Sequence, residues 1–255
     1  MLTAAGIELL PAGLSSAEAI LLLAVSLVGG IVSAVAGIGG GILMLAVLAS
    51  VIPPAALIPV HGIVQIGSNI GRVIVLFKHI AWPIVPPFLI GAVVGAGLGG
   101  ATAVNLPPDV VRLAVGLFIL WSLVANPPGI LRRHGWLNGG ISSYLTMFVG
   151  ASAPFVLVYV KAQDLGRLGQ VGTHAVLMTL QHILKTLIFG FLGFAYGPWI
   201  SIVIGLIATG FVGTLIGRSV LGRTSDTRFA LVVNVVLAAV ALRLIWVAAR
   251  ELLSV

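Results

Sequence analysis

Basic and neutral polar side chains interrupt the long apolar segments of this sequence, whereas acidic side chains do not. The polar residues that could do chemistry there are His61, Asn69, Arg72, His174, His182 and Lys185. All six carboxylates lie near the ends of the chain or in loops. Cation pathways through membranes normally carry acidic side chains, and a cation buried in a membrane usually lines a cavity. The distribution therefore predicts a binding site for an anion, with its positive charge supplied by Arg72 and Lys185.

These side chains also have a structural interpretation. Arg72 lies five residues before Phe77, at the end of its apolar segment, and could extend to the membrane surface. Lys185 lies about nine residues from the end of its segment, or ~14 Å at 1.5 Å per residue, so it reaches the surface less easily. Histidines in membrane helices often serve packing, although a matched pair could also accept a proton. The polar residues therefore indicate either helix packing or a hydrophilic path.

Glycine-containing breaks divide two of the apolar runs, at 37–41 and at 150–154. The apolar segments that follow, 42–51 and 155–160, are too short to cross a bilayer, which takes about 20 helical residues. Unwound backbone at membrane depth is tolerated where it lines a cavity, and in transporters it marks the substrate site. Free NH groups at the start of the short helices would attract an oxyanion. The residues expected to contact it are Gly39, Gly40, Gly41, Ser152 and Ala153.

The composition places the chain in a membrane. Of its 255 residues, 60% are hydrophobic and 7% are charged, and the mean hydropathy is +1.23. No soluble domain of this size could bury that much apolar surface. The net charge of +7 comes from basic residues scattered between apolar segments, so it indicates membrane topology rather than nucleic-acid binding. The absence of cysteine excludes disulfides and thiolate metal sites.

The two halves of the chain match at a constant offset. The breaks that begin at Gly37 and Gly150 are 113 residues apart. The same offset pairs His61 with His174, Asn69 with His182, and Arg72 with Lys185. Equivalent loops of the two halves differ in their content of Lys and Arg, and basic loops favour the cytoplasmic side. The halves are therefore predicted to be repeats with opposite orientations in the membrane.

The sequence thus predicts an all-α integral membrane protein made of two inverted repeats. Each repeat has about three full spans plus one glycine-broken segment, which is re-entrant or forms a half-helix. We expect the first membrane repeat over residues 15–127, a central cytoplasmic loop over 128–136, and the second membrane repeat over 137–250. An odd number of crossings in each half places both chain ends outside. The alternative is that all eight apolar segments simply cross.

Short motifs in this order resemble the TauE/SafE family of sulfite and organosulfonate exporters. They are Gly-Ile-Gly-Gly-Gly at 37–41, Pro53-Pro54, and Gly150, Pro154 and Tyr159 followed by Val160-Lys161. The resemblance covers about residues 17–248. It implies transport of small sulfur-containing anions, such as sulfite, sulfoacetate or thiosulfate, across the inner membrane, with the two glycine breaks as the site regions. The second break has less glycine than the family tends to have there.

We therefore expect a multi-pass inner-membrane secondary transporter of a small sulfur oxyanion that works by alternating access. No enzyme activity, cofactor, metal or nucleic-acid partner is expected, because the spans lack carboxylates and the ATP-binding pattern Gly-x-x-x-x-Gly-Lys-Ser/Thr is absent. The expected partners are the anion and the lipid bilayer. Proton coupling, a homodimer, the direction of transport and the choice of anion stay open. The alternative is a membrane subunit that scaffolds a multi-component transport complex.

Overall fold

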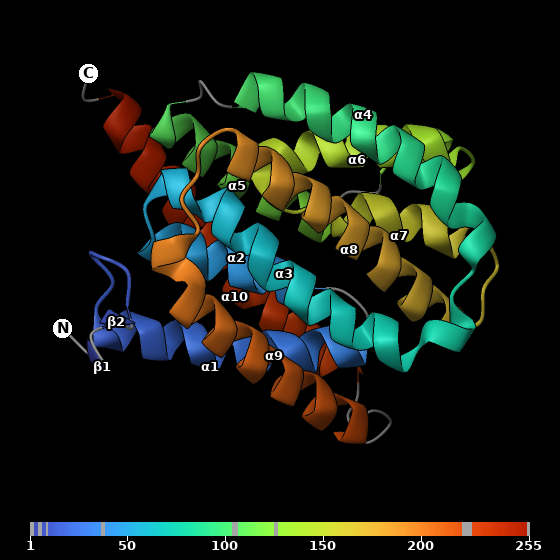
Figure 1. The fold of residues 1–255 in the computed structure, drawn as a ribbon, viewed down its shortest axis with the longest axis horizontal. Coiled ribbons are helices and arrows are strands. Elements are labelled where there is room, and N and C mark those ends of the chain that lie inside the picture. Colours follow the sequence, from blue (N-terminus) through green and yellow to red (C-terminus); the bar gives the residue numbers. More distant parts are fainter. Residues whose placement is uncertain are drawn as a thin grey trace.

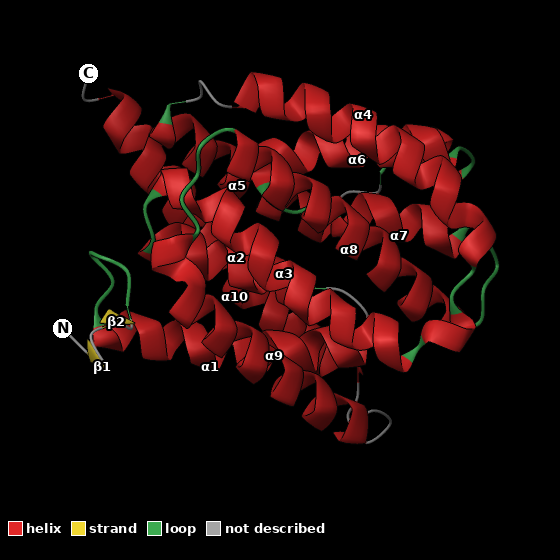
Figure 2. Cartoon of the chain, in the orientation of Figure 1, coloured by secondary structure: helices red, strands yellow, loops and turns green. Residues whose placement is uncertain are grey.

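Helices dominate the computed structural model, which describes residues 3–4, 7–8, 10–36, 39–103, 107–124, 127–220 and 226–253 (Figure 1 and Figure 2). The first half contains α1 (Ser16–Ala36), α2 (Gly40–Val51), α3 (Pro54–Val75), α4 (Val85–Ala103) and α5 (Pro108–Val124). The second half contains α6 (Gly135–Val149), α7 (Ala153–Lys161), α8 (Arg167–Phe191), α9 (Ile200–Val220) and α10 (Asp226–Leu253). Short 3₁₀ helices are η1 (Phe77–His79), η2 (Trp82–Ile84), η3 (Gly129–Arg132) and η4 (Gly197–Trp199). Two-residue strands, β1 (Thr3–Ala4) and β2 (Ile7–Glu8), pair near the N-terminus.

Local sequence sets where several helices begin. Ser15 and Glu18 have the spacing of a capping box, and the structure forms it before α1. The Ser15 NH donates to Glu18 Oε2 at 2.9 Å, and the Glu18 NH donates to Ser15 Oγ at 3.2 Å. Proline is the first residue of α3 and of α5, a position where the helix does not use the backbone NH that proline lacks. The helices after the two breaks are short, as predicted, with 12 residues in α2 and 9 in α7.

In the described part of the chain, four helices are long and apolar enough to cross a membrane. They are α1, α4, α8 and α9. Helix α3 has 22 residues, but it carries a polar face and an internal proline, Pro59. The predicted all-helical membrane architecture is thus present, apart from the two short strands.

Glycine brings two helix pairs into backbone contact. A methyl group on Gly95 of α4 would overlap the carbonyl oxygen of Gly140 on α6. A methyl group on Gly213 of α9 would overlap the carbonyl oxygen of Leu27 on α1. The four-residue glycine spacing from Gly91 predicts such an approach, and the structure confirms it. The α4–α6 and α1–α9 pairs flank the centre, where α3 packs against α8 (Figure 1).

The start of α1 and the end of α10 lie at the same end of the molecule (Figure 1). The α3–α4 and α7–α8 connections lie at the opposite end. Helices α5 and α10 pack against each other behind the central pair.

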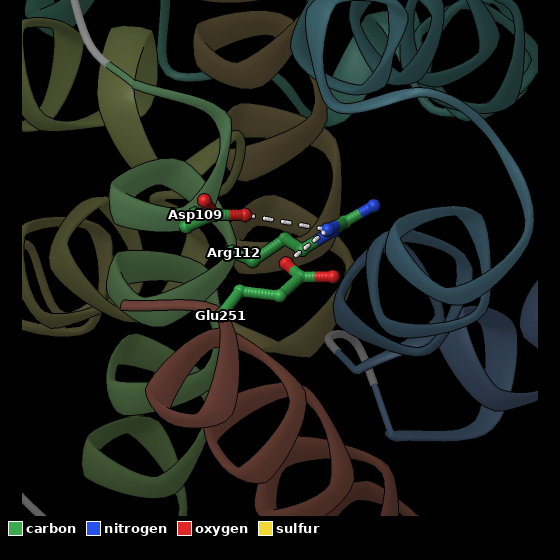
Figure 3. Close-up of polar contacts among 3 residues, drawn as sticks. All are labelled: Asp109, Arg112 and Glu251. Atoms are coloured by element: carbon green, nitrogen blue, oxygen red, sulfur yellow. Dashed lines mark hydrogen bonds and ion pairs between the residues drawn. The ribbon is translucent and has the colours of Figure 1, made fainter. Parts of the chain in front are cut away.

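Among the described residues, ion pairs join the start of α5 to the end of α10 (Figure 3). Arg112 Nη1 lies 2.8 Å from Glu251 Oε2 and 3.4 Å from Asp109 Oδ1. The side chains are partly exposed, so this cluster is expected to contribute about 1 kcal/mol or less. Two of the six carboxylates therefore form ion pairs where the ends of two helices meet, and not along the centre of the bundle.

Candidate functional site

Both breaks contain a glycine in a backbone conformation that other residues rarely adopt. Gly39 has φ +108° and immediately precedes α2, while Gly150 has φ +77° and immediately follows α6. Gly37, where the first break was predicted to begin, lies outside the described residues. Neither α2 nor α7 has a side-chain cap at its N-terminus. Their first-turn NH groups are therefore not satisfied by a capping side chain.

A cavity of about 30 Å³ lies where the two breaks meet. Its lining is Ser33, Gly39, Gly41, Ile42, His61, Gln65, Asn69, Arg72, Ala151, Ala153, His174, Met178 and His182. Eight of the eleven residues predicted to bind the anion are therefore brought together, from both halves of the chain. The other three, Gly40, Ser152 and Lys185, lie behind the cavity wall.

Arg72 is the cationic side chain of the lining. It is 7% exposed, and its Nη2 donates to Asn69 Oδ1 at 2.7 Å. Asn69 in turn donates through Nδ2 to the Gln65 carbonyl oxygen at 2.7 Å. These bonds direct the guanidinium back along α3, away from the nearby end of the helix, so it does not extend to the membrane surface. The structure thus places Arg72 at the cavity, where an anion-binding charge is expected.

The histidines each present an unpartnered nitrogen among the described residues. His61 Nε2 lies 2.9 Å from the Gly41 carbonyl oxygen, and His174 Nε2 lies 3.4 Å from that of Ala153. Because a carbonyl only accepts, each Nε2 is assigned the proton, which leaves Nδ1 as an acceptor. Nδ1 of His61, His174 and His182 is buried without a hydrogen-bond partner in the described part of the chain. The His61 and His182 rings lie edge to face, with centroids 5.8 Å apart.

Lys185 is fully buried behind the second break. Its Nζ donates to the Gly150 carbonyl oxygen at 2.8 Å. Gly150 closes α6, so the lysine charge lies at the negative end of that helix dipole. The trans peptide between Gly150 and Ala151 places the Ala151 NH on the edge opposite Lys185, and Ala151 lines the cavity. The Gly150–Ala151 peptide therefore separates the Lys185 ammonium from the cavity.

Ser152 and Gly40 face other parts of the protein. The Ser152 hydroxyl donates to Gln181 Oε1, and Gln181 Nε2 donates to Ser142 Oγ at 2.9 Å and Ser143 Oγ at 2.8 Å. This network fixes the second break and leaves the Ser152 hydroxyl engaged. A methyl group on Gly40 would overlap the carbonyl oxygen of Gly29 on α1. Gly40 therefore serves the close crossing of α1 and α2.

The charge at the site is positive and unbalanced within the part of the chain that the structure describes. No ion pair joins Arg72 or Lys185 to a described carboxylate. The described residues also contain no group of three His, Asp or Glu side chains arranged to hold a metal ion. A buried cation without a partner is costly, and an anionic ligand would relieve that cost.

Comparison with known proteins identifies the family. A family model described as sulfite exporter TauE/SafE matches residues 22–244. The chain belongs to the TauE/SafE family. The match includes both breaks and every described lining residue of the cavity. No curated protein and no solved structure matches the chain.

Membership in the TauE/SafE family confirms the resemblance seen in the glycine breaks. The family is one of membrane transporters for sulfur compounds, and the apolar helices of this chain agree with that role. The cavity of this TauE/SafE protein is therefore the candidate substrate site.

The sequence-based prediction omits five lining residues of the TauE/SafE cavity: Ser33, Ile42, Gln65, Ala151 and Met178. Gln65 follows His61 by four residues, and this spacing predicts that it shares the polar face of His61, although it is not among the residues expected to contact the anion. Ser33 is, like Ser26, a hydroxyl residue inside an otherwise apolar helix, and Met178 is apolar. Nothing in the sequence distinguishes those two from ordinary packing residues.

The two half-sites differ in the backbone donors they offer. The first helical bond of α2 runs from Leu43 NH to the Gly39 carbonyl oxygen at 2.9 Å, so the three preceding NH groups are not used by the helix. In α7, Pro154 has no NH, and the Phe155 NH donates to the Ser152 carbonyl oxygen at 3.0 Å. Helix α2 therefore offers more free donors than α7.

Gly41→Leu is expected to abolish most transport, because the new side chain enters the cavity. A Cβ at Gly41 would lie 3.0 Å from Gln65 Oε1, a flexible side chain that can yield by tenths of an ångström. Flux by purified protein in liposomes measures the effect, with a loss of at least about tenfold expected for a blocked site. Gly97→Leu is the matched control, because a Cβ there meets nothing within 4 Å. Normal flux in folded Gly41→Leu would contradict the assignment of the cavity.

Proposed function

We propose that this TauE/SafE protein is a secondary transporter of a small sulfur oxyanion, of the sulfite, organosulfonate or thiosulfate class. It would carry the anion across the inner membrane by alternating access. The observation that carries the proposal is the cavity between the two breaks, which combines a buried arginine with helix N-termini and has no described carboxylate. Positive charge and free NH groups are the features that bind oxyanions.

The donors around the cavity suit an anion with several oxygens. The Arg72 guanidinium has donors beyond the one engaged by Asn69. The first turn of α2 adds NH groups through Gly41, which lines the cavity. Lys185 polarises the Gly150–Ala151 peptide, which would strengthen the Ala151 NH as a further donor. Donors from both halves of the chain could therefore hold one oxyanion between them.

The size of the cavity supports alternating access. One water needs roughly 10–15 Å³ of such space, so the present cavity of about 30 Å³ has room for about two waters. Sulfite has four heavy atoms and requires more room. The two breaks would therefore have to separate to admit substrate, and the structure corresponds to a narrow state of the site.

The helix pairing supports two repeats related by a pseudo-two-fold axis. With the 113-residue offset, α1 corresponds to α6 and α3 to α8. Continuing in chain order, α4 corresponds to α9 and α5 to α10. Exchange of the two repeats then converts the α1–α9 pair into the α6–α4 pair. The same exchange converts the α3–α8 pair into itself, and likewise the α5–α10 pair. A two-fold axis exchanges pairs in this way, as inverted repeats require.

The distribution of charged groups supports the proposed orientation. The α3–α4 and α7–α8 connections lie at one end of the molecule (Figure 1). Lys78 belongs to the first connection, and Lys161 and Arg167 border the second. Arg167 donates to the Val35 carbonyl oxygen near the end of α1, which places that end of α1 there too. Basic residues favour the cytoplasm, so this end would face inward and the start of α1 outward.

The unpartnered histidine nitrogens could accept a proton that is transported together with the anion. Addition of a proton to Nδ1 of His61 or His174 would convert an acceptor into a donor for the anion. An anion and a proton could then move together.

Reconstitution of the purified protein in liposomes tests the proposal. We expect saturable flux of at least one of sulfite, thiosulfate and sulfoacetate without ATP, and weaker flux of taurine, whose ammonium group would meet a positive site. Such flux would also eliminate the alternative of a scaffold for another transporter. Folded protein that moves none of these solutes would refute the proposal.

A further inference from the structure

An apolar groove runs along the outer surface of the α4–α6 pair, separate from the cavity. Its volume is about 570 Å³, and its walls come from Ile90 to Leu98 on α4 and from Trp136 to Leu145 on α6. Ile90 and Leu98 are 67% and 60% exposed, so the groove opens away from the protein. Nine residue steps along α6 span ~14 Å, close to one leaflet of a bilayer whose hydrocarbon core is about 30 Å thick.

The Trp136 end of the groove adjoins two arginines, Arg132 and Arg133. The Asn138 side chain donates to the Leu131 carbonyl oxygen at 3.1 Å, which ties this loop to the first turn of α6. Both arginines are exposed, and within the described ranges neither forms an ion pair. The groove therefore has an apolar body and a positively charged head.

We propose that the groove binds an anionic phospholipid, with an acyl chain between α4 and α6 and the phosphate at Arg132 and Arg133. The length of the groove matches one leaflet, and arginine is well suited to phosphate. Trp136 is 58% exposed beside these arginines, as expected for an aromatic side chain at headgroup depth. A second copy of the chain fits less well, because a two-fold contact through this groove would bring the two arginine pairs to the same membrane level.

Native mass spectrometry of the purified full chain, delipidated and titrated with defined lipids, tests this site. The wild-type protein is expected to retain phosphatidylglycerol in preference to phosphatidylcholine with the same acyl chains, and not to bind glycerol phosphate alone. Each basic residue near an anionic headgroup contributes about a factor of five, so Arg132→Gln with Arg133→Gln should weaken phosphatidylglycerol binding ~30-fold. Lys78→Gln removes a charge at the same end of the molecule, outside the groove lining, and should leave binding unchanged.

A substitution inside the groove separates this site from general charge attraction. A Cβ on Gly140 meets Gly91 at an ordinary 3.5 Å, so Gly140→Leu can fill the groove without a clash at Cβ, and Gly140→Ala is its control. Gly140→Leu should reduce retention of both lipids at least about tenfold, whereas Gly140→Ala should not. Equal retention of the two lipids by the wild type would overturn the proposal. Undiminished lipid binding by Gly140→Leu would also overturn it. The same holds if the wild type is a dimer that Gly140→Leu dissociates without any loss of bound lipid.

Discussion

Arg72→Gln is expected to reduce anion flux by roughly 10- to 100-fold while the protein stays folded. A hydrogen bond to a charged group contributes about 1.5–3 kcal/mol, and each 1.4 kcal/mol corresponds to a factor of ten. Loss of the guanidinium leaves the cavity without its directly lining cation. Folding should be little affected, because the only side-chain partner of Arg72 in the described part of the chain is Asn69, to which glutamine can still donate. Flux in liposomes and thermal unfolding in detergent measure the two effects.

Two further variants make the Arg72 experiment specific. Arg243→Gln is the same substitution at an exposed position of α10 and should leave flux unchanged. Arg72→Lys keeps the charge but loses the planar fork of donors, so its flux should fall between that of the wild type and that of the glutamine variant. If both Arg72 variants showed wild-type flux, Arg72 would not be part of the substrate site.

Lys185→Met is expected to lower flux about tenfold without lowering stability. Burial of an unpaired ammonium costs several kcal/mol, whereas loss of its bond to Gly150 costs about 1–3 kcal/mol. The cost of burying the ammonium is larger than the cost of losing its hydrogen bond, so the unfolding temperature should stay the same or rise. Flux should nevertheless fall, because the Gly150–Ala151 peptide loses its polarising charge and the site loses one of its two buried cations.

The Lys185 prediction separates a binding role from a structural one. Lys161→Met is the control, because Lys161 is exposed at the end of α7 and its loss should change neither quantity. If Lys185→Met unfolded at a much lower temperature, and its folded fraction transported normally, the lysine would serve only to hold the second break.

The fold could be predicted from sequence where the controlling signal is local. Gly39 before α2 and Gly150 after α6 have positive φ and lie outside regular helix, and the lengths of α2 and α7 follow from the breaks that precede them. The glycine spacing on α4 likewise predicts a close neighbour, because a missing side chain leaves room whichever helix arrives. The sequence does not reveal that this neighbour is α6.

The candidate site could be predicted only in part. His61 and Arg72 line the cavity because they share one face of a regular helix, and helical spacing is visible in the sequence. Ser152 and Lys185 were expected to contact the anion, but their polar atoms bind Gln181 and Gly150. Which partner such a group meets depends on a helix that is distant in the chain.

The sequence by itself determined the membrane class and the two breaks, which follow from composition and backbone preference. It also showed the shared offset of the polar residues, and its short motifs resembled the family that the comparison identified. The tertiary structure decided that both breaks meet at one cavity, that Gly40 faces α1, and that the Lys185 ammonium binds the Gly150 carbonyl oxygen instead of lining the cavity. These depend on how helices about a hundred residues apart pack, because a side chain on a helix contacts whatever surface the fold brings to that face.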